Sequence, residues 1–119
     1  MAPNPIATYE EVKDLSNHPE KYLVDVRGPH ELEKTGKIPI SINIPIADLE
    51  TELNLSSDNF REKYGREKPS KTSEIMFHCS KGGRGQKACD AAIAMGFVNA
   101  RNYKGGWNEW AEKEGLLNE

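Results

Sequence analysis

Residues 75–86 read Ile75-Met76-Phe77-His78-Cys79-Ser80-Lys81-Gly82-Gly83-Arg84-Gly85-Gln86. A run of strand-forming residues ends at a cysteine, and the next six residues include three glycines and two cations. An alanine-rich segment with helical spacing follows. This order predicts a strand, a glycine-rich loop and a helix, with the cysteine directly after the strand, where ligands of parallel sheets bind.

The predicted loop has the properties of an anion-binding site around a thiol. Glycines let consecutive backbone N–H groups converge on one point, and the following helix adds unpaired N–H donors and a positive dipole end. The positive charges of Lys81 and Arg84 also favour the thiolate form of Cys79. The pattern indicates a nucleophile that attracts an anionic substrate. The alternative is that Cys79 ends a buried strand and the glycines only form a turn.

Length and composition limit the classes of protein. A chain of 119 residues fits a single domain, 1–119, with one core that needs no disulfide or metal. The net charge of −3 and the mixed-sign surface argue against a nucleic-acid partner. The sequence shows neither a membrane-spanning stretch nor a secretory signal pattern, so we expect no membrane partner and a cytoplasmic protein, with a mitochondrial location also open. Both cysteines are then expected to be reduced.

Predicted strands alternate with predicted helices along the chain. Strands are expected over 6–7, 22–26, 38–45, 75–78 and 98–103. Helices are expected from the capping box at Thr8 through Leu15, from Pro29 to about Gly36, and over 46–55, 56–64, 84–95 and 107–114. This alternation predicts an α/β fold with about five mainly parallel strands and helices on both faces of the sheet.

Four segments resemble the rhodanese-like sulfurtransferase family, and together they cover nearly the whole chain. They are Leu23-Val24-Asp25-Val26-Arg27, Glu31 with residues 36–45, the Cys-x-x-Gly-x-Arg loop from Cys79 to Arg84, and the Gly-Gly-x-x-x-Trp segment ending at Trp110. The insert with Phe60, Tyr64 and Glu67-Lys68-Pro69 is similar to the small single-domain type. Two departures concern the local backbone path: Lys37 replaces the usual His, and Ile40-Ser41 replaces Gly-Ala.

The resemblance implies a rhodanese-like three-layer fold and transfer of sulfur through a persulfide on Cys79. The donor would be thiosulfate or another sulfane-sulfur compound such as a persulfide. The acceptor would be glutathione, thioredoxin or, in an assay, cyanide. The loop residues Ser80, Lys81, Gly82, Gly83, Arg84 and Gly85 would bind the substrate, with no metal or organic cofactor. Lys81 is expected to attract the anion, the alternative being a solvated surface lysine.

The residues expected to support the site are Asp25, Arg27, Glu31 and Trp107. Arg84 either orients the oxyanion or ties the loop to Asp25 or Glu31. In this family Asp25 and Arg27 resemble residues that support the loop without reacting. Trp107 is interpreted as core packing, with a place in the pocket wall as the alternative.

Cys89 and the histidines receive structural interpretations. Cys89 is expected to be a small core residue and not a resolving thiol, because about 7.5 Å of helix separates it from Arg84. His78 precedes Cys79 and is expected to point to the opposite side of the sheet as a core group, not a base. No cysteine and histidine spacing resembles a zinc site.

Two other functions stay open from the sequence. Cysteine phosphatases and arsenate reductases use Cys-x5-Arg, whereas here Gly85 stands where that arginine would be. The shorter loop fits a sulfur atom better than a phosphoryl group. The second alternative is a non-catalytic domain, or a carrier that gives its persulfide to a protein. The oligomeric state is expected to be a monomer by default, and the physiological donor and acceptor stay undetermined.

Overall fold

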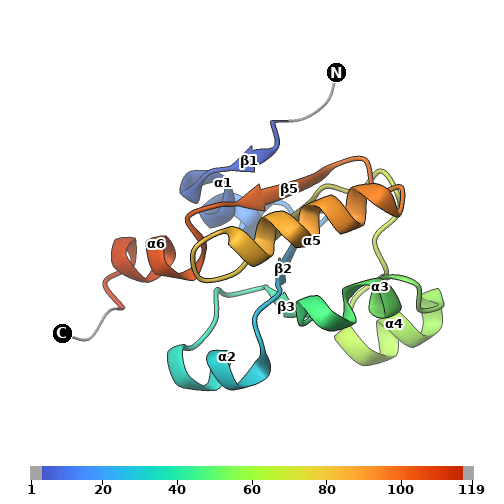
Figure 1. Ribbon diagram of the computed structural model, residues 1–119, viewed down its shortest axis with the longest axis horizontal. Coiled ribbons are helices and arrows are strands. Elements are labelled where there is room, and N and C mark those ends of the chain that lie inside the picture. Colours follow the sequence, from blue (N-terminus) through green and yellow to red (C-terminus); the bar gives the residue numbers. More distant parts are fainter. Residues whose placement is uncertain (1–3, 117–119) are drawn as a thin grey trace.

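The computed structural model describes residues 4–116 and contains a five-stranded parallel sheet of order β1-β5-β4-β2-β3 (Figure 1). The strands are β1 (Ile6–Ala7), β2 (Tyr22–Asp25), β3 (Ile42–Asn43), β4 (Ile75–His78) and β5 (Ala100–Tyr103). The helices are α1 (Tyr9–Lys13), α2 (Pro29–Thr35), α3 (Leu49–Leu53), α4 (Ser57–Tyr64), α5 (Gly83–Ala94) and α6 (Gly106–Lys113), with 3-10 helices η1 (Asp14–Asn17) and η2 (Ile46–Asp48). The predicted α/β fold is confirmed.

Two hydrophobic clusters cover the two faces of the sheet. Side chains alternate along β4, so Ile75 and Phe77 join one cluster and Met76 joins the other. The first cluster includes residues of α3, α4 and α5, and the second includes residues of α1 and α6. Burial on both faces explains why the central strands read as continuous apolar runs. The sheet is therefore the middle of three layers.

The helix ends follow signals in the sequence. The Thr8 side chain accepts from the Glu11 N–H while the Glu11 carboxylate accepts from the Thr8 N–H, which completes the predicted capping box of α1. Pro29 occupies the first turn of α2, where its missing N–H costs nothing. Gly65 ends α4 in the left-handed conformation with φ of 72°.

The prediction of a strand over 38–45 was wrong for most of its length. Only Ile42–Asn43 forms a strand. Before it, the Ser41 N–H donates to the Ile38 carbonyl in a turn, and Ile40 has a φ of 67°. The period of two in isoleucine placement therefore reflects a turn followed by a short strand. Three smaller corrections concern element bounds. The helix expected through Leu15 is divided into α1 and η1, the helix expected over 46–55 is divided into η2 and α3, and β5 begins at Ala100, not at 98.

The carboxyl ends of the inner strands bring polar residues together. Asp25 pairs in register with His78 on one side and with Asn43 on the other. Cys79 directly follows β4, which lies between β5 and β2. The site is thus at the centre of this edge. Within residues 4–116, every helix is too short or too polar to cross a membrane.

Candidate active site

The sulfur of Cys79 lies at the focus of two backbone N–H groups. The Gly82 N–H donates to Sγ at 3.1 Å and the Gly85 N–H at 3.4 Å. The first donor precedes α5 and the second belongs to its first turn. N–H groups at a helix N-terminus favour negative charge on the atom they face. The residue is 2% exposed, so this charge would be shielded from bulk water.

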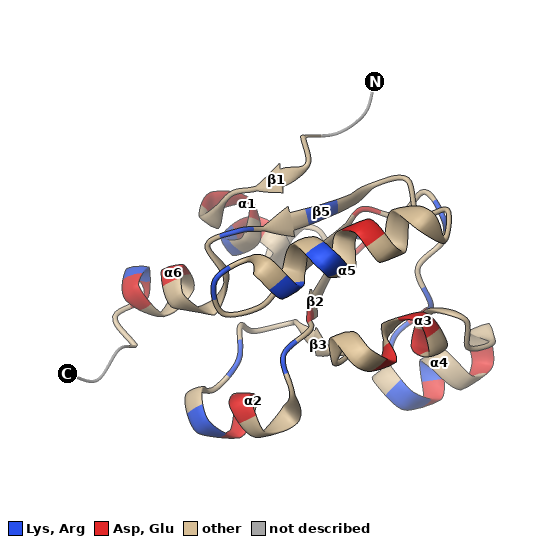
Figure 2. Cartoon of the chain, in the orientation of Figure 1, with Lys and Arg blue, Asp and Glu red and all other residues tan. Residues whose placement is uncertain are grey.

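An open pocket of about 490 Å³ lies over Cys79. Its lining residues are Cys79, Ser80, Lys81, Gly83, Arg84 and Lys87. They include three cations and no carboxylate. Figure 2 shows the corresponding basic segments in the loop and in the first half of α5. We name this the active-site pocket, and its charge suits a small anion.

Arg84 holds the loop to α2. Its Nη1 and Nη2 donate to the two oxygens of Glu31 at 2.7 and 2.9 Å. The same carboxylate accepts from the Gly28 N–H at 2.8 Å and so also caps α2. The hydrogen bond from Arg84 lowers the pKa of Glu31 to about 2. Of the three roles open to Arg84 from the sequence, the structure shows the tie to Glu31.

Asp25 and Arg27 form a buried ion pair behind the site. Arg27 Nη2 lies 2.8 Å from Asp25 Oδ2, and both side chains are at most 1% exposed. The remaining guanidinium donors reach the Thr35 hydroxyl and the Gly36 carbonyl. Asn43 donates from Nδ2 to the carbonyls of Asp25 and Arg27. These contacts fix the chain between β2 and α2, the helix that carries Glu31.

The start of α6 supports the loop from the other side. The Trp107 N–H donates to the Cys79 carbonyl at 2.8 Å, and the Asn108 N–H donates to the Ser80 carbonyl at 3.2 Å. A Cβ on Gly106, which has a φ of 59°, would collide with the Cys79 carbonyl. The Trp107 ring packs in the second cluster beneath the Arg27 guanidinium, 5.2 Å from it. Trp107 is therefore a core residue and does not line the active-site pocket.

Gly82 and Gly85 occupy positions with little space for a side chain. Gly82 has a φ of 99°, and a Cβ on it would lie 2.8 Å from the Lys104 carbonyl. A Cβ on Gly85 would collide with Asn102 Oδ1. Asn102 also donates from Nδ2 to the Gly82 carbonyl at 3.2 Å. The close packing of the loop on β5 aims both N–H groups at the sulfur.

The structure adds Asn43, Lys87 and Asn102 to the residues expected from the sequence. Asn43 lies within the segment that resembles the family, but its hydrogen bonds to the β2 end become visible only in three dimensions. Lys87 was missed, although it lies one helical turn beyond Gly83, and this helical spacing is the sequence signal for its place in the pocket. No sequence pattern marks Asn102, whose contact depends on β5 lying beside β4.

The second cysteine and His78 are inside the protein. Cys89 belongs to the first cluster, and burial raises the pKa of its thiol to about 11. His78 is fully buried, contacts the Cys79 carbonyl through Nδ1 at 3.2 Å, and has Nε2 3.6 Å from Asp25 Oδ2. Burial lowers the pKa of His78, which favours the neutral ring. Within the part of the chain described, no three His, Cys, Asp or Glu side chains form a group that could hold a metal ion.

A cysteine held by loop N–H groups at the end of the central strand of a five-stranded parallel sheet defines a rhodanese-like protein. The chain belongs to the rhodanese-like sulfurtransferase family, since the family model described as Rhodanese-like domain matches residues 8–113. The matched region contains the Cys79 loop and all the residues that support it.

The chain is similar to several known proteins over almost the full length of each. The chain is 54% identical over 111 residues to rhodanese domain-containing protein CG4456 of Drosophila melanogaster, covering 93% of this chain and 100% of that protein. It is 37% identical over 115 residues to the thiosulfate:glutathione sulfurtransferase of Homo sapiens, covering 96% and 99%. The structure of the human single-domain sulfurtransferase TSTD1 matches with a TM-score of 0.84 and 36% identity, over 93% of this chain and 98% of that one.

Proposed function

We propose that this protein is a thiosulfate sulfurtransferase in which Cys79 carries a sulfane sulfur from thiosulfate to a thiol such as glutathione. The human relative named for thiosulfate and glutathione supports both substrates. The charged residues of the active-site pocket are all cations, which supports an anionic donor. The observation that carries the proposal is the pair of N–H groups, of Gly82 and Gly85, directed at Cys79 Sγ.

In the first step, the Cys79 thiolate attacks the outer sulfur of thiosulfate. A new S–S bond forms at Cys79, and the S–S bond of thiosulfate breaks with its electron pair on the departing sulfite. Lys81 attracts the dianion, and the N–H groups of Gly82 and Gly85 stabilise the attacking thiolate. The remaining N–H groups of residues 80–85 are expected to hold the outer sulfur of the persulfide and the leaving sulfite.

In the second step, the acceptor thiolate attacks the outer sulfur of the persulfide. The bond between that sulfur and Cys79 Sγ breaks, and its electron pair returns to Sγ as a thiolate. The acceptor leaves as a persulfide, or as thiocyanate when cyanide replaces the thiol. Because sulfite departs before the acceptor reacts, we expect ping-pong kinetics.

The position of Arg84 argues against a phosphatase. A phosphatase loop needs an arginine directed at the transferred phosphoryl group, but both terminal nitrogens of Arg84 are engaged by Glu31. The N–H groups of Gly82 and Gly85 instead surround one sulfur atom. Hydrolysis of an aryl phosphate at an enzyme-like rate would contradict this interpretation.

The proposal is tested by measuring sulfite released from thiosulfate with glutathione or cyanide as acceptor. Cys79→Ser is expected to abolish turnover, because it removes the atom that receives the sulfur. Thiosulfate alone is expected to add one sulfur, about 32 Da, to Cys79 in the intact protein.

Cys89→Ser is the matched control, since it changes a buried thiol outside the active-site pocket. It is expected to retain most of the activity. A persulfide on Cys79 that neither acceptor removes would instead indicate a carrier for another protein. Absence of both the added sulfur and sulfite release would reject the proposed function.

A further inference from the structure

A second pocket of about 630 Å³ adjoins the active-site pocket and is formed between β1, α1 and α6. Its lining comes from residues 6–10, Lys81, residues 104–105, Asn108, Glu109 and Lys113. Lys81 also lines the active-site pocket, so the two pockets meet at this residue. We name it the β1–α6 pocket. Its volume lies in the range of sites for small molecules.

The wall of the β1–α6 pocket is bonded to the Cys79 loop. The carbonyl of Lys104 packs on Gly82, and the Asn108 N–H donates to the Ser80 carbonyl at 3.2 Å. A molecule in this pocket would therefore lie against the loop that holds Cys79. Because Lys81 lines both pockets, a thiol on that molecule would lie beside the pocket that contains Cys79.

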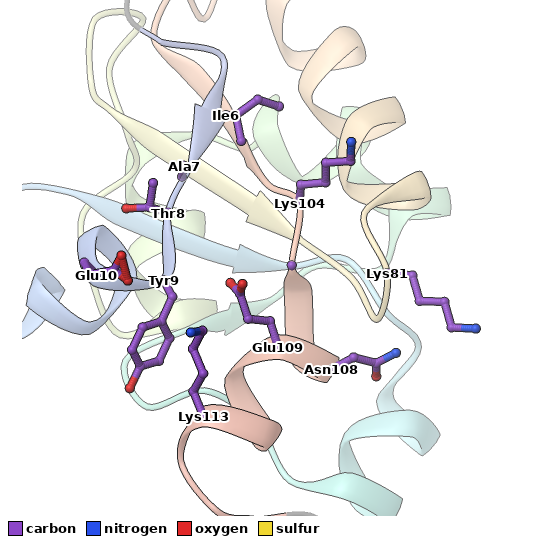
Figure 3. A pocket seen from close by; sticks show the side chains of 11 residues that line it. Ile6, Ala7, Thr8, Tyr9, Glu10, Lys81, Lys104, Asn108, Glu109 and Lys113 are labelled. Carbon is purple, nitrogen blue, oxygen red and sulfur yellow. The ribbon is translucent and has the colours of Figure 1, made fainter.

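The charges of the two pockets differ. The charged residues that line the active-site pocket are all cations, whereas the β1–α6 pocket combines Lys81, Lys104 and Lys113 with the carboxylates of Glu10 and Glu109. In Figure 3, Glu109 and Lys113 extend from α6 toward the segment that carries Glu10, while Lys81 and Asn108 lie on the side of the Cys79 loop. A dianion such as thiosulfate matches the first pocket. A molecule that carries carboxylates and an ammonium group matches the second.

Several polar side chains in the β1–α6 pocket have unused hydrogen-bonding capacity. Among residues 4–116, no ion pair or side-chain hydrogen bond holds the side chains of Lys81, Lys104 or Asn108. Each is exposed. A charged ligand would gain these contacts without first breaking contacts inside the protein.

We propose that the β1–α6 pocket binds the sulfur acceptor, a small peptide thiol with two carboxylates and one ammonium group, such as glutathione. This inference rests on the proposed function. Glu109 binds the ammonium group and Lys113 the carboxylate beside it. Lys104 binds the carboxylate at the other end of the peptide, and the central thiol faces Cys79 past Lys81.

The test measures KM for glutathione in Lys104→Ala and in Glu109→Gln at saturating thiosulfate. Each substitution is expected to raise this KM about three- to fivefold, the size of one partly exposed ion pair. The kcat/KM values for 2-mercaptoethanol and cyanide are expected to stay within about twofold, because these acceptors carry none of the recognised groups. Lys34→Ala removes an exposed lysine of α2 that lines neither pocket and is the matched control.

Glutathione ethyl ester separates recognition from a general loss of positive charge. Its glycine carboxylate is blocked, so Lys104→Ala is expected to change its KM by less than about twofold. Glu109→Gln is expected to raise KM for the ester as much as for glutathione, since the ammonium group is retained. Equal effects of Lys104→Ala on glutathione, its ester and 2-mercaptoethanol would overturn the proposed pocket.

A binding measurement removes the dependence on turnover. S-methylglutathione cannot react, and in Cys79→Ser it is expected to shift the backbone amide resonances of residues 8–10 and 104–113. Shifts confined to other surfaces, or no shifts, would reject the site. The proposed function fails separately, if thiosulfate adds no sulfur to Cys79 of the wild-type protein and no sulfite is released with cyanide or 2-mercaptoethanol.

Discussion

The guanidinium group of Arg84, in the first turn of α5, binds both carboxylate oxygens of Glu31 on α2, at 2.7 and 2.9 Å. This pair joins two segments that are 53 residues apart in the sequence. Glu31 also caps α2 by accepting from the Gly28 N–H. The ion pair has two consequences, one for the Cys79 loop and one for the Glu31 carboxylate. The loop is anchored at its helical end, and the carboxylate is kept ionised.

Glu31→Gln is expected to lower the free energy of unfolding by about 1 kcal/mol at pH 7, because both partners are partly exposed and solvent screens the pair. The hydrogen bond from Arg84 lowers the pKa of Glu31 from 4.5 to about 2. A lowered pKa in the folded state stabilises the protein above the unfolded value, and this stabilisation is lost as the pH falls between these two values.

Urea unfolding of wild type and Glu31→Gln between pH 7 and pH 2 measures this effect. The difference between the two proteins is expected to be constant down to about pH 5 and to decrease below it. A difference that grows on acidification would contradict the assigned pair.

Gly82→Ala is expected to damage the site, whereas Gly83→Ala is expected to be tolerated by the fold. Alanine at position 82 would adopt a φ of 99° and place its Cβ 2.8 Å from the Lys104 carbonyl, while a Cβ on Gly83 meets nothing within 4 Å. We expect Gly82→Ala to lose about 1–3 kcal/mol of stability and Gly83→Ala less than about 0.5 kcal/mol. Because the Gly82 N–H faces Sγ, kcat of Gly82→Ala should fall at least about tenfold.

Thermal unfolding and single-turnover sulfite release measure the two effects separately. Comparable losses of stability in both glycine variants would show that the clash at the Lys104 carbonyl does not limit position 82.

Arg27→Ala is expected to destabilise the protein by about 3–5 kcal/mol, because it leaves the carboxylate of Asp25 buried without its partner. Both side chains are at most 1% exposed. Arg61→Ala is the matched control, since its pair with Glu67 is exposed on both sides and 3.5 Å apart. That control should change stability by less than about 1 kcal/mol. Denaturant unfolding measures the free energy of unfolding of both variants. Similar losses of stability in Arg27→Ala and Arg61→Ala would mean that Asp25 is solvated after the Arg27 substitution.

The segment from Ile75 to Gln86 could be predicted because its signals are contiguous. The strand, the glycines and the helix follow one another, so the position of Cys79 is readable without tertiary contacts. The partner of Arg84 was not readable, because Asp25 and Glu31 both end up near the loop and only the path of α2 selects between them. Asn102 was missed for the same reason, since its role arises when β5 lies beside β4.

The overextended strand prediction over 38–45 has a local cause. Alternating isoleucines satisfy a strand pattern, but that pattern carries no information about the sign of the backbone angle φ. Ile40 adopts a φ of 67°, which a β-branched residue rarely does. The departure from the family's Gly-Ala at Ile40-Ser41 marked this position as unusual, and the structure locates the strain there.

Ile40→Gly is expected to be more stable than Ile40→Ala by about 1 kcal/mol, because a left-handed backbone penalises any Cβ. The order is informative, since alanine usually exceeds glycine at positions with an ordinary φ. Ile40 is 49% exposed, and both variants remove its side chain beyond Cβ, so they differ only in the presence of the Cβ. Chemical denaturation of the two variants measures the difference. An alanine variant that is the more stable would show that this segment relaxes out of the left-handed conformation.

Alkylation of the native protein is expected to modify Cys79 and leave Cys89 unmodified. Cys89 lies in the core, where burial, followed by the charge of Asp90, raises the pKa of its thiol to about 11. At pH 8 almost none of it is the reactive thiolate. Cys79 faces the active-site pocket, and its sulfur accepts hydrogen bonds from two N–H groups.

Mass spectrometry after iodoacetamide should therefore find one adduct in the native protein and two after denaturation. Thiosulfate added beforehand should prevent the single native adduct from forming on the Cys79 sulfur itself, because that atom is then bonded to the outer sulfur. A native adduct on Cys89 would show that α5 opens on the timescale of the reaction.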